Sequence, residues 1–219
     1  MRTKTLILTA ALGAAGIATS MAQVFSVNAV GYINVTIPAG KIQMVANQLI
    51  RGANTLAEVI PTAPDGTIVY SFLPNGTYDV STYLDFLAAW DPNPAIPMGP
   101  GVGAFISNPT ASPMTLTFVG DVPQNTPPGT PLTTPIPPGL SIRSSKVPQA
   151  GTLPALGYTP GDGDICYQFN PADGSYTVNT YLDFLGAWDP LDPNIAVGEA
   201  FFIFNNGVAK SWTRSFTVN

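Results

Sequence analysis

The sequence predicts an all-β protein of two tandem, pseudo-equivalent β-sandwich-like modules, each with one short helix. An internal repeat gives the number of modules: residues 82–92 read TYLDFLAAWDP, residues 180–190 read TYLDFLGAWDP, and ten of the eleven positions are identical. The offset of 98 residues is about the size of a small domain. Short runs of β-branched and aromatic residues between Gly, Pro and Asn turns indicate the fold class.

Strand patterns occur at matching places in the two copies. Val30 to Ile37 (VGYINVTI) ends at a Pro-Ala-Gly turn, and Ile136 is followed by Pro-Pro-Gly in the same way. We predict strands over residues 30–37, 67–72, 102–107 and 114–119 in the first half, and over 164–169, 199–205 and 212–218 in the second.

Four segments follow from the repeat: a signal peptide (1–22), a first β module (23–121), a proline-rich connector (122–138) and a second β module (139–219). The connector holds seven prolines, which fix φ and cannot donate to a ladder, so we predict an extended linker there and no strand. A second boundary is open, because Val119-Gly-Asp-Val echoes Val30-Gly-Tyr-Ile. The second module would then start near Phe118, with the proline-rich stretch after its first strand.

The repeated segment itself shows helical spacing. Its apolar residues fall at i, i+3, i+4 and i+7, namely Tyr83, Phe86, Leu87 and Trp90, with the copies Tyr181, Phe184, Leu185 and Trp188. Thr82 and Asp85 resemble an acidic capping box, and Pro92 would end the element. We therefore predict a two-turn helix in each module, with Trp90 and Trp188 in the core.

The N-terminal segment has the features of an export signal. Arg2 and Lys4 precede an apolar stretch from Leu6 to Ala18, and Ser20-Met21-Ala22 is a small-x-small cleavage site. We expect a secreted, periplasmic or cell-surface protein after cleavage near Ala22. We expect no membrane insertion of the mature chain, because Pro, Gly or Asp interrupts every later apolar run.

Composition limits the partners. After removal of the signal, 13 acidic residues against 6 basic ones leave a net charge of −7, and residues 52–142 contain no Lys or Arg. A phosphate backbone or an anionic membrane needs several cationic contacts, so we expect no nucleic-acid partner and no binding to anionic lipid.

The residue types needed for common catalytic sites are scarce. The chain has no histidine and a single cysteine, Cys166, which aligns with Val69 and is expected in a buried apolar slot. The repeated carboxylates Asp85 and Asp183 are interpreted as helix caps, each with a neighbouring acid at Asp91 or Asp189. We therefore predict no enzyme, and no catalytic, cofactor or metal residues.

Calcium binding near Asp162 stays an alternative. Asp162-Gly163-Asp164 resembles part of a calcium loop, but the full EF-hand pattern is missing and the other copy, Asp65-Gly66-Thr67, lacks the second acid. A tight Asp-Gly turn is the favoured interpretation.

Tyrosines outside the repeated segment are the remaining binding candidates. Tyr70 and Tyr78 match Tyr167 and Tyr176 in the second copy. These four side chains are predicted to be ligand contacts, for example for a sugar ring.

The start of the mature chain resembles a known group of proteins. Val27 to Gly40 reads VNAVGYINVTIPAG, Trp-Asp-Pro occurs in both copies, and Gly198 begins a Gly-x-x-Phe-Phe strand. These features are similar to secreted repeat proteins of verrucomicrobial and related environmental bacteria. The resemblance implies secretion and β-architecture. It transfers no site residues, because that group has no assigned activity.

The function expected from the sequence is structural. We expect a non-enzymatic secreted or cell-envelope protein that contacts other proteins or associates with itself, with no cofactor. Terminal strands are one route to assembly, because Phe216 to Asn219 nearly repeats Phe25 to Asn28. Both ends pairing within the monomer is the other interpretation of these strands. The alternative function is a carbohydrate-binding module that uses exposed Tyr and Trp.

Export gives the first testable prediction. The native protein should begin at Gln23, since the signal peptidase cuts after a small residue at Ala22. Its intact mass, measured by mass spectrometry, checks this N-terminus. A full-length chain recovered from the cytoplasm would contradict both the cleavage site and the compartment.

Overall fold

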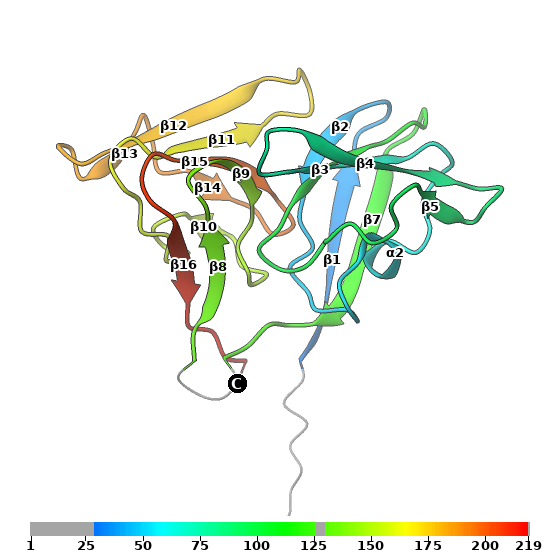
Figure 1. Cartoon of the computed structure of the whole chain (residues 1–219), viewed down its shortest axis with the longest axis horizontal. Helices are drawn as coiled ribbons and strands as arrows, with labels where there is room; N and C mark the ends of the chain where they lie inside the picture. Colours follow the sequence, from blue (N-terminus) through cyan, green and yellow to red (C-terminus); the bar gives the residue numbers. More distant parts are fainter. Residues whose placement is uncertain (1–28, 126–129, 219) are drawn as a thin grey trace, which may run out of the picture.

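The computed structural model describes residues 29–125 and 130–218, so the proposed signal peptide and cleavage site lie outside the described residues. The architecture is all-β, as predicted (Figure 1). The first module contains β1 (Val30–Ile37), β2 (Ile42–Val45), β3 (Ile68–Phe72), β4 (Tyr78–Leu84), β5 (Ala89–Asp91), β6 (Ala104–Ser107) and β7 (Met114–Asp121).

The second module repeats this set in the same order. Its strands are β8 (Leu132–Ile136), β9 (Gly139–Arg143), β11 (Ile165–Phe169), β12 (Tyr176–Leu182), β13 (Ala187–Asp189), β15 (Phe201–Asn205) and β16 (Lys210–Arg214), with a short extra pair β10 (Gly151–Thr152) and β14 (Asn194–Ile195).

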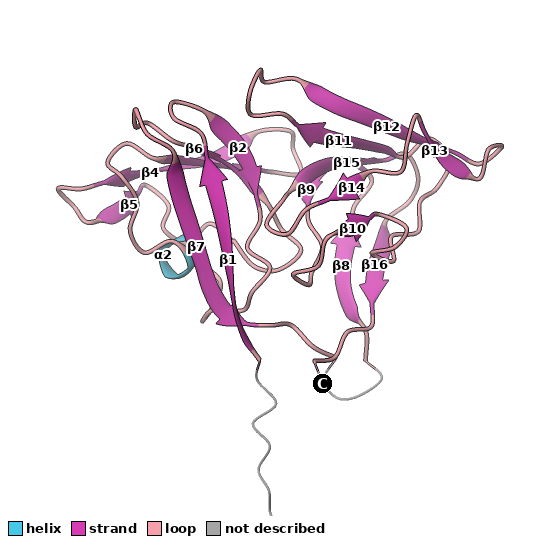
Figure 2. Cartoon of the chain, turned by 180° about the vertical axis from the view of Figure 1, so that it is seen from behind, coloured by secondary structure: helices cyan, strands magenta, loops and turns pink. Residues whose placement is uncertain are grey.

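Each module combines a two-stranded antiparallel ribbon with a five-stranded antiparallel sheet. The ribbons are β1–β7 and β8–β16, and the sheets have the equivalent orders β2-β6-β3-β4-β5 and β9-β15-β11-β12-β13. The sheets lie at the broad end of the molecule, and the ribbons run from there to the narrow end, where the C-terminus lies (Figures 1 and 2).

Alternation along the strands builds a core in each module. On β1, Ile33, Val35 and Ile37 are buried while the residues between them face solvent. This apolar side packs with the inner face of the five-stranded sheet, which includes Val69 and Ile106. A matching cluster around Cys166 and Ile203 fills the second module.

The predicted helix in the repeated segment is wrong. Residues 82–91 form the end of β4, a turn and β5, and residues 180–189 form the equivalent hairpin of β12 and β13. Tyr83 and Trp90 are cross-strand partners with ring centroids 5.4 Å apart, and both are buried. Phe86, which the helical stripe would bury, is 81 % exposed. The capping-box interpretation of Asp85 and Asp183 fails with the helix, whereas the core position predicted for Trp90 and Trp188 is confirmed.

One short helix occurs in the described residues, and it is not where the sequence predicted one. Helix α2 (Leu56–Val59) begins at a capping box between Thr55 and Glu58. Its counterpart in the second module, around Leu153, is a series of turns. No helix in residues 29–125 and 130–218 is long and apolar enough to cross a membrane.

The proline-rich segment is also corrected. Leu132 to Ile136 forms β8, in spite of Pro135, and pairs with β16 over five residues. A two-stranded ribbon leaves one edge of β8 unpaired, where a residue without an N–H is tolerated. The second module therefore opens with β8, and Phe118 belongs to β7 of the first module, which excludes the alternative boundary.

The strand predicted over residues 212–218 ends earlier, at Arg214. The following segment binds within the chain: Phe216 and Asn125 exchange hydrogen bonds of 2.9 and 3.0 Å. Residues 25–28, its proposed counterpart, lie outside the described part of the chain.

The modules meet through reciprocal contacts that indicate a pseudo-twofold axis. Val45 forms a β-bridge to Glu199, and Arg143 forms the equivalent bridge to Val102. Backbone hydrogen bonds join Ala46 N to Gly198 O at 2.9 Å and Ser144 N to Gly101 O at 3.3 Å. Each module thus pairs its own backbone with that of the other.

Gly103 and Ala200 occupy equivalent positions in this interface and face each other. A Cβ on Gly103 would overlap the Cβ of Ala200 and lie 2.8 Å from Cγ2 of Ile142. The approach is closer than two side chains permit, so one of these equivalent positions must be glycine.

A substitution at this contact tests the interface. Gly103→Ala should lower the free energy of unfolding by about 1–3 kcal/mol through overpacking, and adding Ala200→Gly should recover part of that loss. Gly207→Ala is the control, because its Cβ would have only an ordinary contact, 3.7 Å from Asn205 Oδ1. Denaturant unfolding compares native protein, Gly103→Ala, Ala200→Gly, the double variant and the Gly207→Ala control, and strictly additive effects of the first two substitutions would contradict the contact.

Candidate functional site

An aromatic cluster forms where the second faces of the two five-stranded sheets meet. On β3, Val69 and Ser71 point into the module core, so Tyr70 and Phe72 point to the opposite face. The same alternation acts in the second copy. We define the aromatic cluster as Tyr70, Phe72, Tyr78 and Phe105 with their equivalents Tyr167, Phe169, Tyr176 and Phe202.

Ring contacts in the aromatic cluster cross the pseudo-twofold axis in pairs. Phe72 packs against Phe202 with centroids 5.2 Å apart, and Phe105 packs against Phe169 at the same distance. Phe105 and Phe202 are 5.9 Å apart at the centre. Edge-to-face packing of this kind adds to the stabilisation from burial, so the cluster holds the modules together.

All four tyrosines predicted as ligand contacts belong to the cluster. Tyr70 contacts Tyr78 and Tyr167 contacts Tyr176, with interplanar angles of 88° in both pairs. Tyr70 and Tyr167 are half-buried, whereas Tyr78 and Tyr176 keep 42 % and 40 % of their surface exposed. Burial raises the pKa of both exposed phenols above the ordinary value, so they are neutral at physiological pH.

An apolar groove opens beside these rings. It has a volume of about 520 Å³ and is lined by Phe72, Tyr78, Leu140, Tyr167, Tyr176, Phe202 and Phe204. None of these side chains carries a charge at neutral pH. A concave apolar surface with a few phenol hydroxyls can bind an apolar or aromatic side chain.

The pseudo-symmetric position differs from the groove in its side chains. Ile42 stands where the second copy has Leu140, and the residue before it, Lys41, donates a hydrogen bond of 3.0 Å from its Nζ to the carbonyl of Ala172 in the other module. Ser107 stands where the second copy has Phe204. The two positions therefore differ in their side chains, although their strands pair in the same register.

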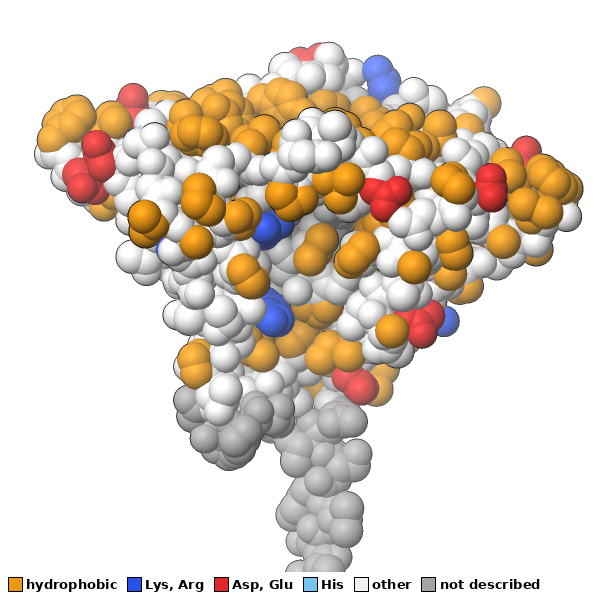
Figure 3. Space-filling model, viewed as in Figure 1, with side chains coloured by type: hydrophobic (Ala, Val, Ile, Leu, Met, Phe, Trp, Pro, Cys, Tyr) orange, Lys and Arg blue, Asp and Glu red, His pale blue; other side chains and the backbone are white. Residues whose placement is uncertain are grey.

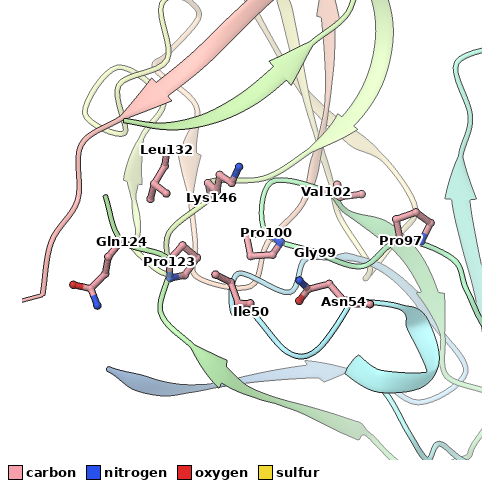
Figure 4. A pocket seen from close by; sticks show the side chains of 11 residues that line it. Ile50, Asn54, Pro97, Gly99, Pro100, Val102, Pro123, Gln124, Leu132 and Lys146 are labelled. Atoms are coloured by element: carbon pink, nitrogen blue, oxygen red, sulfur yellow. The ribbon is translucent and has the colours of Figure 1, made fainter. Parts of the chain in front are cut away.

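A second hollow lies on the other side of the interface (Figure 4). It has a volume of about 510 Å³ and is lined by residues that include Ile50, Asn54, Pro100 and Lys146. Lys146 is the one charged residue in its lining, and its Nζ already donates to Thr133 O at 2.8 Å. This hollow lacks the acid–base pair that catalysis would need.

Asp164 forms a buried ion pair with Lys210. The carboxylate is fully buried and also accepts hydrogen bonds from Tyr158 Oη at 2.8 Å, Gly161 N at 3.0 Å and Asn206 N at 3.2 Å. Its oxygens are thus occupied by protein donors. No group of three or more metal-ligating side chains occurs in the described part of the chain.

The equivalent position in the first copy has no charged side chains. Thr67 and Met114 stand where the second copy has Asp164 and Lys210, and Thr67 Oγ1 lies 3.9 Å from Met114 Sδ. The ion pair is therefore a structural variant of a neutral contact. An alignment of the two copies would have indicated the ion pair, because an acid replaces Thr67 and a base replaces Met114 in the same copy.

The Asp-Gly turns confirm their predicted structural interpretation. Gly66 and Gly163 have φ of 78° and 75°, which glycine adopts readily. Asp65 Oδ1 accepts a hydrogen bond of 2.8 Å from Asp85 N, and Asp162 Oδ1 accepts one of 2.9 Å from Asp183 N. Each aspartate therefore anchors the base of a hairpin turn.

Cys166 lies in the apolar slot predicted for it. It is fully buried in the second core, and burial raises the pKa of its thiol. A thiol that stays protonated and inaccessible is not a nucleophile.

Comparison of the chain with protein-family models, with curated proteins and with solved structures found no match. The functional conclusion therefore rests on geometry and chemistry.

Three of the four predicted tyrosines, Tyr78, Tyr167 and Tyr176, line the groove, but sequence reasoning missed the phenylalanines and Leu140 that complete it. Their signal was present, since Phe72 and Phe169 share a strand face with Tyr70 and Tyr167 at period two. What was missing is that this face meets another sheet and not solvent.

Replacing the ion-pair residues of the second copy with their uncharged counterparts from the first copy tests the equivalence of the two sites. Lys210→Met alone should cost about 3 kcal/mol of stability, because Asp164 would stay buried without its cation. The triple change Asp164→Thr, Lys210→Met, Tyr158→Phe should recover most of that loss, since it recreates the neutral pair and removes the hydroxyl that donates to Asp164. Thermal unfolding compares the two variants, and equal losses would contradict the equivalence of the two sites.

Proposed function

We propose that the protein is a non-enzymatic, secreted or cell-envelope structural protein that binds other protein surfaces through the apolar groove and the aromatic cluster. The single observation that supports this most is the exposure of Tyr78 and Tyr176 beside a groove with no charged lining. Tyrosine with Phe and Leu is typical of the centre of protein interfaces, where burial of aromatic surface supplies most of the affinity.

The geometry fits a protein ligand better than a sugar. Each exposed tyrosine is held by the edge or face of a neighbour at 5.3 Å, Tyr78 by Phe72 and Tyr176 by Phe169. Sugar stacking needs an open ring face with polar side chains at its border, and here the rings are crossed and the groove is apolar. Trp90 and Trp188 are buried and do not contribute to a platform.

Catalysis is disfavoured by the chemistry of the described groups. Asp164 is held in an ion pair, the thiol of Cys166 is buried, and Asp85 and Asp183 lie at exposed turns away from the groove lining. A general acid or base must reach the substrate in a protected site, and the groove offers only phenols.

A photo-crosslinking residue in place of Tyr176 tests the binding surface in the producing cells. It should capture a protein, and the same residue at Val208, an exposed position outside the groove lining, should not. With Tyr78→Ser added, the yield at position 176 should fall by about tenfold or more, since burial of a large side chain is lost.

A glycan array with the purified mature protein supplies the other outcome. Specific glycan binding that is lost with Tyr78→Ser, together with no crosslinked protein at position 176, would replace this proposal with a carbohydrate-binding function.

A further inference from the structure

The hairpins β4–β5 and β12–β13 carry large apolar side chains fully into solvent at their turns. We define the two tips as Asp85–Ala88 and Asp183–Gly186. Phe86 and Phe184 are 81 % and 80 % exposed, and Leu87 and Leu185 are 50 % and 54 % exposed. The hairpins point to opposite ends of the molecule (Figure 1), and hydrophobic side chains flanked by acidic ones gather at both upper corners (Figure 3).

The tips are held rigidly. Within each tip a hydrogen bond of 3.0 Å closes the turn, from Leu87 N to Leu84 O and from Leu185 N to Leu182 O. The aspartate anchors described above hold the base of each turn, and the packed Tyr–Trp ring pair fixes the strands behind it. A fixed apolar tip loses little conformational entropy on binding, so it is suited to insertion into a pocket.

Packing within the chain does not explain the apolar tips. Buried positions have diverged between the copies, as Thr67 with Asp164 and Met114 with Lys210 show. The exposed Asp-Phe-Leu of each tip is nevertheless identical. Since no core depends on Phe86 or Phe184, a contact outside the monomer is the physical reason to keep both.

We propose that each tip inserts its Phe-Leu pair into the apolar groove of a second copy of this chain. The same chain offers both halves of the contact: two rigid tips whose phenylalanines are about 80 % exposed, and an open groove of about 520 Å³ that continues the aromatic interface between the modules. This inference rests on the proposed function and names the partner that occupies the groove.

The arrangement sets the form of the assembly. Each molecule has two tips and a groove lined in part by Phe204, a position where the first copy has Ser107. Tip and groove are different surfaces, so the contact is heterologous and can continue from one molecule to the next.

Two variants separate the halves of the contact. The tip variant carries Phe86→Ser, Leu87→Ser, Phe184→Ser and Leu185→Ser, all at exposed positions. The groove variant carries Leu140→Lys, which places a charged side chain in the apolar groove lining. Val208→Ser, at a position 83 % exposed, is the control for loss of any surface hydrophobe.

Sedimentation velocity over a range of concentrations gives the readout. Native mature protein and Val208→Ser should self-associate, and each of the two other variants should dissociate at concentrations about 10–100-fold higher than native or stay monomeric. A mixture of the tip variant and the groove variant should form a complex, since one keeps the groove and the other keeps the tips. Circular dichroism confirms that both are folded.

A native protein that stays monomeric at millimolar concentration, or a mixture that fails to associate while native protein does, would overturn the tip-in-groove contact. The proposed function would survive either result if position 176 still crosslinks to a different protein. It would fail with the inference if no protein is captured there.

Discussion

The close approach of Gly103 and Ala200 is the constraint on which the arrangement of the modules depends. Around this contact, reciprocal bridges join Val45 to Glu199 and Arg143 to Val102, so each module completes its backbone pairing with the other. Gly101 and Gly198 extend the same constraint, since a Cβ on either would lie within 2.7 Å of Thr134 or Val35 in the opposite module. Small residues at these equivalent positions allow the two modules, each with its own core, to pack closely against each other.

This contact also brings together the aromatic cluster and the apolar groove. Because the modules meet edge to edge, the second faces of their sheets converge, and Phe105 packs against Phe202 at the centre and not against water. The pseudo-symmetry of the backbone would give two equal grooves. Phe204 lines the groove on one side, whereas Ser107 stands at the equivalent place on the other, so side chains make the two positions differ.

The copies show where the fold tolerates change. A neutral Thr67–Met114 contact and a buried Asp164–Lys210 ion pair support equivalent strands, in agreement with the small net difference between a satisfied ion pair and an apolar contact of similar volume. The hairpin tips differ from these buried positions, because their residues are identical in the two copies although they are exposed and do not pack in a core. Selection on packing alone would produce the reverse pattern.

The sequence by itself determined the duplication, the all-β class and the burial of Trp90 and Trp188, because period and alternation are local properties of the chain. Tertiary structure decided the rest. Tyr83 and Trp90 have the spacing of a helix, but they become buried as cross-strand partners in a hairpin, and a one-dimensional pattern does not distinguish these cases. The proline-rich segment becomes a strand because its partner β16 lies far along the chain. Contacts between residues distant in sequence, which local propensity cannot express, fixed both outcomes.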